Sequence, residues 1–377
     1  MKRGSLFLGL ILGASLGATA VLIKTKEKTA KVYKASWFVA HTPESPHLIQ
    51  QAQEFAHRLE ERSHGQLHLD LVFPKNSFIK DGNNFRDAIR MIGTNEAQIS
   101  QISSTHLSLF DPQFQVFDLP FLFKSHEHAA KVFDGEIGDR IRSHFLEASG
   151  HVVRSLAFTY SGGYRVFVSN KRLSKASDLV GLRMQFYGPK ADPSETLSQN
   201  PALTHLYTDL AFKMRPVMTN DHPEYFSQLD FFKNNDIDIT EDHLSHFTRV
   251  YNKVGILRGK MDYVWETNHS LFLTSIVVNE KFFQSLPKDL QTLLKEEAQR
   301  LALLEREASI ELDQNARQWL INSGYTVTKP TEKERNALIK ESRDVYDKLG
   351  PQIGPDLIKS IEDLGASLSS SSLADTH

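Results

Sequence analysis

The chain has 377 residues, of which 40% are hydrophobic and 24% are charged, and its formal net charge is −2 at pH 7. This composition is typical of a soluble globular protein of two domains or of one large α/β unit, and it offers no basic excess for holding nucleic acid. Cysteine is absent, which excludes disulfides, thiolate metal sites and a cysteine nucleophile.

The N-terminus has the pattern of an export signal. Lys2 and Arg3 precede an uncharged stretch over residues 4–23, which contains the small-residue site ATA and is followed by the charged stretch KTKEKTAK. Such a leader directs export, and its uncharged part is also long enough to span a bilayer. We therefore expect residues 1–30 to be either a cleaved signal peptide or an uncleaved membrane anchor.

The first elements after the leader are a helix and a strand. Apolar residues recur at helical spacing through residues 45–65 and alternate with polar residues through residues 66–74. Further strand-like runs are HVVRSLAF, YRVFVSN, LRMQF, DIDI and SIVVN, and helical stretches such as NNFRDAIRMIGTN and SHEHAAKVFDG separate them. This alternation predicts an α/β protein. We expect the glycine pair between the first two runs to form a turn.

A long helical stretch dominates the C-terminal third. From Pro287 to Ser323 apolar residues recur at helical spacing, and Gly324 follows as a cap. An unbroken helix of this length would extend about 55 Å, which exceeds the width of an ordinary domain. The pattern fits either a kinked pair of core helices or a strut across two domains. Two other segments are predicted to be irregular, a surface loop over residues 187–202 and a disordered tail over residues 367–377.

The sequence carries no catalytic motif. It has no HExxH, GxSxG, P-loop or post-strand GxGxxG pattern, and no histidine pair has zinc-like spacing with a third ligand nearby. We therefore expect neither an enzyme nor a bound cofactor, and we expect the HEH stretch at residues 126–128 to be solvated. The acids Asp236, Asp238, Glu241 and Asp242 fit either a site for a cation or, more simply, a solvated turn after a short strand.

Several segments, taken in order, resemble one protein family. VFDLPFLFKSHEHAAKVFDGEIG, YSGGYRVFVSNKRLSKASDLVGLRMQF, NNDIDITEDH and TNHSLFLTSIVVNEKFFQSLPKDLQ are similar to segments of the solute-binding subunits of TRAP (tripartite ATP-independent periplasmic) transporters. The similarity covers about residues 33–345 in unbroken order. The resemblance implies a periplasmic receptor that captures a small, usually carboxylate-bearing solute and delivers it to membrane subunits.

The resemblance also implies the fold. It is a two-domain, periplasmic-binding-protein-like α/β fold with mixed sheets, which closes like a clam shell and has a long helix bridging both domains. The expected domain I combines residues 31–160, 268–306 and 336–366, and domain II combines residues 161–267 and 307–335. We expect a monomer that binds no nucleic acid. The alternative is a receptor-fold protein without a transport role, acting as a sensor or scaffold.

A ligand site follows from the same resemblance. Family members hold the ligand carboxylate with two arginines 20 residues apart and an asparagine, and these positions fall at Arg165, Gln185 and Asp242. A plain carboxylate would meet opposing charges at Arg165 and Asp242. We therefore expect a zwitterion or a polar solute with a donor facing Asp242, or a carboxylate bridged by a cation; otherwise Arg165 and Asp242 pair with each other. Further candidates at strand ends are His41, Ser103, Ser104 and His269.

Overall fold

The structure is a computed structural model that describes residues 31–40, 46–73, 84–186, 205–208, 211–218, 232, 234–251 and 257–374. Residues Val32–His377 form one compact unit, and Met1–Lys31 form a separate one. The predicted leader over residues 1–30 and the predicted loop over residues 187–202 lie outside the described residues. Within the described ranges, no helix is both long enough and apolar enough to cross a membrane.

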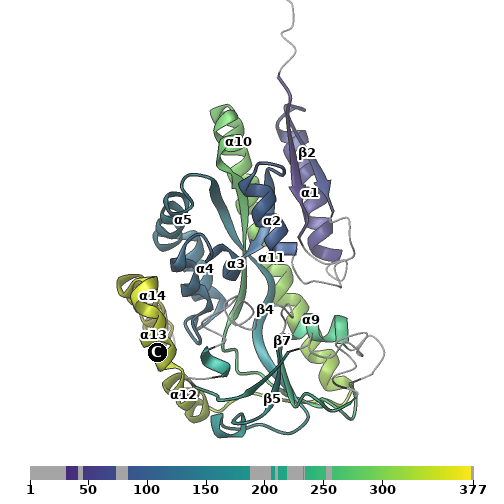
Figure 1. Cartoon of the computed structure of the whole chain (residues 1–377), viewed down its shortest axis with the longest axis vertical. Coiled ribbons are helices and arrows are strands. Elements are labelled where there is room, and N and C mark those ends of the chain that lie inside the picture. Colours follow the sequence, from purple (N-terminus) through teal and green to yellow (C-terminus); the bar gives the residue numbers. More distant parts are fainter. Residues whose placement is uncertain are drawn as a thin grey trace, which may run out of the picture. The chain divides into compact units, whose positions relative to one another are not determined.

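Helices and strands alternate along the compact unit (Figure 1). The strands are β1 (Tyr33–Phe38), β2 (Leu67–Val72), β3 (Ile99–Ser103), β4 (Val153–Ser169), β5 (Arg183–Phe186), β6 (Arg215–Met218), β7 (Ile239–His243), β8 (Tyr263–Trp265), β9 (Leu271–Asn279) and β10 (Thr326–Thr328). The helices and helical turns are α1 (Pro46–Arg62), α2 (Asn84–Gly93), α3 (Ser104–Leu107), η1 (Pro112–Asp118), α4 (His126–Asp134), α5 (Glu136–Ala148), η2 (Ala176–Asp178), α9 (Leu244–His246), η4 (Phe247–Tyr251), α10 (Glu280–Ser285), α11 (Lys288–Asn322), α12 (Glu332–Glu341), α13 (Arg343–Ile353) and α14 (Pro355–Ala374).

The strands form a mixed sheet in the order β2-β1-β3-β9-β4-β7-β5-β6, and β8 joins β10 to β4. We call β2, β1, β3, β9 and the start of β4 the first sheet half, and the end of β4 with β7, β5, β6, β8 and β10 the second sheet half. β2 lies at one end of the unit and β5 at the other (Figure 1). Parallel pairs such as β1–β2 and β5–β6 stand beside antiparallel pairs such as β4–β7. The predicted mixed α/β class is confirmed.

β4 is the strand that links the two sheet halves, and it is continuous, so the prediction of two strands separated by a glycine turn is wrong. Its ladder with β9 shifts register just before Tyr164, beside the glycine pair. A Cβ at Gly162 would overlap the ring of His243, and a Cβ at Gly163 would overlap the carboxylate of Asp313. The glycines are therefore required because two side chains pack directly on the strand backbone.

α11 confirms the prediction of a long helix, since it runs unbroken for 35 residues, or about 52 Å. Its first half contributes Leu290 and Leu301 to the core around β1 and α1. Its last turns contribute Ala316 and Leu320 to the core around the end of β4. The helix therefore joins both sheet halves as a strut. The apolar spacing does not settle every position, because Trp319, one of the apolar residues that recur at helical spacing in this stretch, is 44% exposed.

The C-terminal helices cover one side of the unit, alongside α4 (Figure 1). α14 continues to Ala374, so the tail predicted to be disordered from residue 367 is helical as far as it is described. α14 also buries His128, whose Nε2 lies 2.9 Å from the carbonyl oxygen of Ile361. The prediction that the HEH stretch is solvated is therefore wrong for His128, because sequence gave no sign that a distant helix packs on α4.

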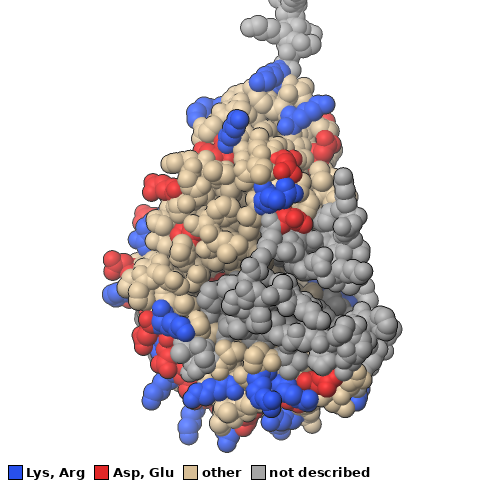
Figure 2. All heavy atoms as spheres, in the orientation of Figure 1, with Lys and Arg blue, Asp and Glu red and all other residues tan. Residues whose placement is uncertain are grey.

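Charges of both signs are distributed over the surface, and Figure 2 shows Lys and Arg side chains gathered at the end where β5 lies. The topology explains this, because β4 ends and β5 and β6 begin at the same sheet edge. Exposed basic residues at that edge are Lys171, Arg172, Lys175, Lys213 and Arg215. Glu241 and Asp242 lie toward the opposite end of β7, near the start of α9, so the candidate ligand residues are separate from this basic edge.

Candidate ligand-binding site

β7 positions the acidic residues of the site. Glu241 and Asp242 lie within this strand, so the prediction of a solvated turn is wrong for them. In the antiparallel ladder with β4, Arg165 lies opposite His243, and Phe167 lies opposite Glu241. Directly opposed residues share a face of the sheet, and successive residues alternate between faces. Arg165 and Glu241 therefore share one face, and Asp242 lies on the other.

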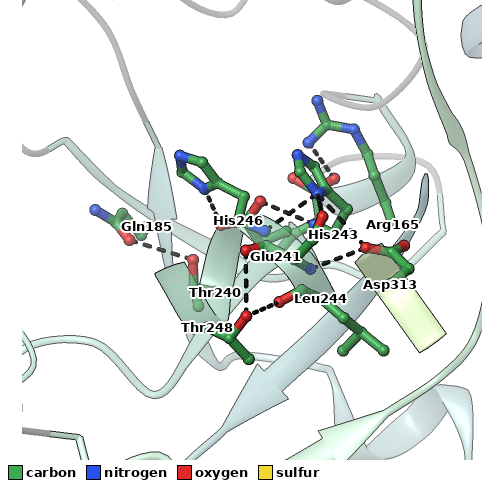
Figure 3. Close-up of polar contacts among 11 residues, drawn as sticks. Arg165, Gln185, Thr240, Glu241, His243, Leu244, His246, Thr248 and Asp313 are labelled. Carbon is green, nitrogen blue, oxygen red and sulfur yellow. Dashed lines mark hydrogen bonds and ion pairs between the residues drawn. The ribbon is translucent and has the colours of Figure 1, made fainter. Parts of the chain in front are cut away.

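Arg165 forms an ion pair with Glu241, with 2.5 Å between Nη1 of Arg165 and Oε1 of Glu241 (Figure 3). The two side chains are only 19% and 9% exposed. Burial acts to lower the pKa of Arg165, but the charge and hydrogen bond of Glu241, together with Tyr207 and Asp242, outweigh burial and hold that pKa above the ordinary value. Burial raises the pKa of Glu241, which Arg165 offsets only in part. The guanidinium also lies over the ring of Phe272, with 4.7 Å between its Cζ and the ring centroid.

His269 and Tyr207 extend this buried cluster. The imidazole of His269 is fully buried, with Nε2 2.9 Å from the hydroxyl of Tyr207 and Nδ1 2.7 Å from that of Thr267. Burial, with repulsion from Arg165, lowers the pKa of His269 to about 3, so the ring is neutral at physiological pH. Burial also raises the pKa of Tyr207, to which Glu241 adds. His269 therefore offers a neutral polar group within electrostatic reach of Arg165.

Asp242 is paired with histidine rather than with Arg165. Its Oδ2 lies 2.6 Å from Nδ1 of His246, and its Oδ1 accepts a hydrogen bond from the backbone N–H of His243 at 2.8 Å. Burial acts to raise the pKa of Asp242, but His246, His243 and Arg165 together hold it below its ordinary value. The carboxylate is therefore ionised. The expected alternative in which Arg165 and Asp242 pair with each other is wrong, because strand alternation directs Arg165 to Glu241.

Gln185 lies on the far side of β7 from Arg165 (Figure 3). It is 3% exposed, and its Oε1 accepts a hydrogen bond from the Thr240 hydroxyl at 3.2 Å. The nearby basic residue Arg183 does not take its place, because two nitrogens of Arg183 donate to Asp238 at 3.0 and 2.9 Å. Gln185 and Asp242 therefore lie on the same face of the sheet. Because residue 185 is glutamine and not arginine, it adds no positive charge near Asp242.

Two of the remaining candidates, Ser103 and Ser104, make hydrogen bonds to groups other than the cluster residues named above. Ser103 and Ser104 are both 2% exposed at the junction of β3 and α3. The hydroxyl of Ser103 lies 2.6 Å from Nδ1 of His106, and that of Ser104 donates to the carbonyl oxygen of Leu273 at 3.3 Å. His41 lies outside the described residues. In the described part of the chain, no three His, Asp or Glu side chains are arranged to hold a metal ion.

Tyr207, Phe272 and His246 were not among the predicted site residues, and Glu241 was considered only for a cation site, not as a partner of Arg165. Glu241 could have been found, because extending the short strand to residue 243 places Glu241 and Arg165 on the same face. His246 lies one helical turn after Asp242, a spacing that allows contact once a turn of helix is expected there. Tyr207 and Phe272 reach the cluster only through the tertiary fold, and no local pattern marks them.

Comparison with known proteins shows which family the chain matches. The pattern of bacterial extracellular solute-binding protein family 7 matches residues 38–190 and 229–352. The C4-dicarboxylate-binding periplasmic protein DctP of Rhodobacter capsulatus is 27% identical over 93% of this chain and 97% of its own. The 2,3-diketo-L-gulonate-binding periplasmic protein YiaO of Escherichia coli is 24% identical over 85% of this chain and 88% of its own.

Solved structures show the same fold. A TRAP periplasmic solute-binding protein from Ochrobactrum anthropi superimposes with a TM-score of 0.75 at 20% identity, over 92% of this chain and 99% of its own. One from Ralstonia eutropha, with bound (S)-2-acetolactate, superimposes with a TM-score of 0.71 at 21% identity, over 89% of this chain and 99% of its own. With the match to family 7 over most of its length, the chain belongs to the bacterial extracellular solute-binding proteins that serve as receptors of TRAP transporters.

Proposed function

We propose that this receptor binds an organic acid with one carboxylate, which Arg165 holds, and with a hydroxyl or ammonium donor that faces Asp242. One observation carries the proposal: the buried Nε of Arg165 has no hydrogen-bond partner in the described part of the chain, while Nη1 is bound by Glu241. Leaving a buried polar group without a partner costs about 1 to 3 kcal/mol, and more for a charged group. A ligand carboxylate would satisfy it.

The charge balance of the cluster supports a single carboxylate. The positive charge of Arg165 is balanced by the negative charge of Glu241, and the ionised Asp242 is paired with His246. Gln185 is buried and adds hydrogen-bonding groups without charge. A second carboxylate near Asp242 would meet a negative charge, whereas a donor group would gain a charge-assisted hydrogen bond. The relatives named above bind C4-dicarboxylates, 2,3-diketo-L-gulonate and acetolactate, all of which carry carboxylates. The loss of the second family arginine favours the acids with one carboxylate and further polar groups.

We further propose that the solute lies between the two sheet halves, in domains with the boundaries predicted above, and that a monomer delivers it to TRAP membrane subunits. Residues 1–30 would direct export to the periplasm, whether they are removed or remain as an anchor. The family serves in transport rather than catalysis. This favours the transport role over a sensor or scaffold.

Four six-carbon acids test the ligand class. Calorimetry in chelator-treated buffer would compare D-galactonate (one carboxylate, five hydroxyls), 6-aminohexanoate (a zwitterion), adipate (two carboxylates) and hexanoate (one carboxylate, no donor). We expect D-galactonate or 6-aminohexanoate to bind at least about tenfold more tightly than adipate and hexanoate, since one hydrogen bond to a charged group is worth about 1.5 to 3 kcal/mol. Tighter binding of adipate than of both donor-bearing acids would contradict the proposal.

A further inference from the structure

Asp313, on α11, joins three elements beside the ligand cluster. Its Oδ1 accepts a hydrogen bond from the backbone N–H of Ser245 in α9 at 2.8 Å and lies 3.9 Å from Nδ1 of His243 (Figure 3). Its Oδ2 lies so close to Gly163 that a Cβ at that position would overlap it. One carboxylate thus connects the long helix to the start of α9 and to the bulge of β4.

His243 continues this contact toward Arg165. Its ring packs on the backbone of Gly162, where a Cβ would overlap three ring atoms. The ring also lies nearly parallel to that of Phe272, with 6.1 Å between centroids and 16° between planes. Phe272 in turn lies under the guanidinium of Arg165. Packed side chains therefore run without interruption from Asp313 to Arg165.

The position of this contact in the fold gives it a role. β4 pairs with β9 as far as Tyr164 and with β7 from Arg165 onward, so it changes partners next to the glycine pair. α11 likewise passes from the core of the first sheet half to that of the second. Both of these elements meet at Asp313 and Gly163. If one sheet half rotates relative to the other, the backbone must change conformation where β4 and α11 pass from one half to the other.

We propose that Asp313 is a positioning residue of the receptor. It holds α9 and His243 against α11 across the glycine pair, and it thereby sets the relative placement of the two sheet halves and of the residues that contact solute. The proposal rests on the solute-receptor function, but it does not depend on which acid binds or on Arg165 as its anchor. Asp313 acts through Ser245 and His243 and does not touch the solute.

Spin labels measure this placement without any solute. The chain has no cysteine, so two exposed positions can carry labels: Gln53→Cys on α1, which packs against β2 of the first sheet half, and Ser177→Cys on η2, which connects β4 to β5 of the second. We expect a single narrow distance distribution in the parent protein, by double electron–electron resonance, and at least about a twofold broader one in Asp313→Ala. Asp313→Asn keeps an oxygen that can accept from Ser245, and it should retain the narrow distribution.

A double-mutant cycle provides the second readout. Gly163→Ala should push the Asp313 carboxylate away, broaden the distribution as Asp313→Ala does, and lower the unfolding midpoint by roughly 2 to 4 °C. In the Asp313→Ala background, the same glycine substitution should change the midpoint by less than about 1 °C, because the overlap is gone. Equal decreases in both backgrounds would overturn the proposal. So would an unchanged distance distribution in Asp313→Ala. Both readouts are made without solute, so they are separate from any failure to bind an organic acid.

Discussion

Replacing Glu305 with glutamine is expected to stabilise the protein at pH 8 by about 3 to 4 kcal/mol. Glu305 lies in the middle of α11 with 1% of its surface exposed, and its carboxyl meets Nε2 of Gln101 at 2.6 Å. Burial raises its pKa to about 8, although hydrogen bonds from Gln101 and Thr159 lower it in part. Glutamine keeps the shape and the hydrogen bonding without a charge to bury.

The sign of the pH dependence follows from this raised pKa. The contribution of Glu305 to stability is fully present below its unfolded pKa of 4.5 and is lost as the pH rises through about 8. The advantage of Glu305→Gln should therefore be near zero at pH 4.5 and should grow by about 1.4 kcal/mol per pH unit toward pH 8. Thermal unfolding from pH 4.5 to 8.5 measures this advantage, with an expected gain in the unfolding midpoint of roughly 4 to 5 °C at pH 8.

Glu297 offers a matched control on the same helix. It too is 1% exposed, but its oxygens accept hydrogen bonds from Arg58 and Arg62 at 2.7 to 2.9 Å. Burial acts to raise its pKa, but these two arginines outweigh burial and lower it. Glu297→Gln should therefore destabilise the protein at neutral pH. If Glu305→Gln and Glu297→Gln changed the free energy of unfolding in the same direction across the pH range, the raised pKa of Glu305 would be wrong.

Arg165→Ala is expected to weaken solute binding at least ~30-fold, because truncating one partner of a buried charge pair costs about 2 to 5 kcal/mol. The proposed carboxylate would lose its charge-assisted donor. Arg165→Lys serves as the matched variant, since it keeps the charge but loses the Nε donor and the planar fork. We expect Arg165→Lys to bind more tightly than Arg165→Ala and more weakly than the parent, as measured by calorimetry with the tightest of the four six-carbon acids.

The single alanine substitution also leaves Glu241 buried without its cation, which by itself destabilises the fold. The double variant Arg165→Met with Glu241→Gln removes both charges and should recover most of the lost unfolding midpoint. It should still fail to bind. An affinity in the double variant equal to that of the parent would remove Arg165 from the site, whereas lost binding in a stable double variant assigns the effect to the ligand contact.

The long helix and the strand pattern could be predicted because they depend on local periodicity. α11 repeats its apolar residues through many turns, and the core contacts of Leu290 and Leu320 follow from that spacing. The buried polar residues in the middle of the helix could not be predicted, because Glu305 accepts a hydrogen bond from Gln101, which lies 204 residues away in the sequence. The same holds for His128, whose partner Ile361 lies 233 residues away.

The strands that carry the candidate ligand residues could be predicted, but the pairing of those residues could not. The resemblance gave the positions of Arg165, Gln185 and Asp242, and the structure places all three on adjoining strands. Their opposite charges also led us to consider Arg165 and Asp242 as partners, and the predicted strand-like run DIDI stopped short of Glu241. Extending the predicted strand by a few residues would have placed Glu241 on the same face of the sheet as Arg165. The glycine pair was misjudged because its cause, the close packing of His243 and Asp313, involves residues distant in the chain.

A crystal structure of the protein with D-galactonate or 6-aminohexanoate bound tests the central claim most directly. We expect a carboxylate oxygen about 2.7 to 2.9 Å from a guanidinium nitrogen of Arg165, with the ligand's hydroxyl or ammonium donor toward Asp242. We also expect Glu241 to remain paired with Arg165. A carboxylate bound elsewhere, with the Nε of Arg165 still without a hydrogen bond, would show that Arg165 does not hold the solute.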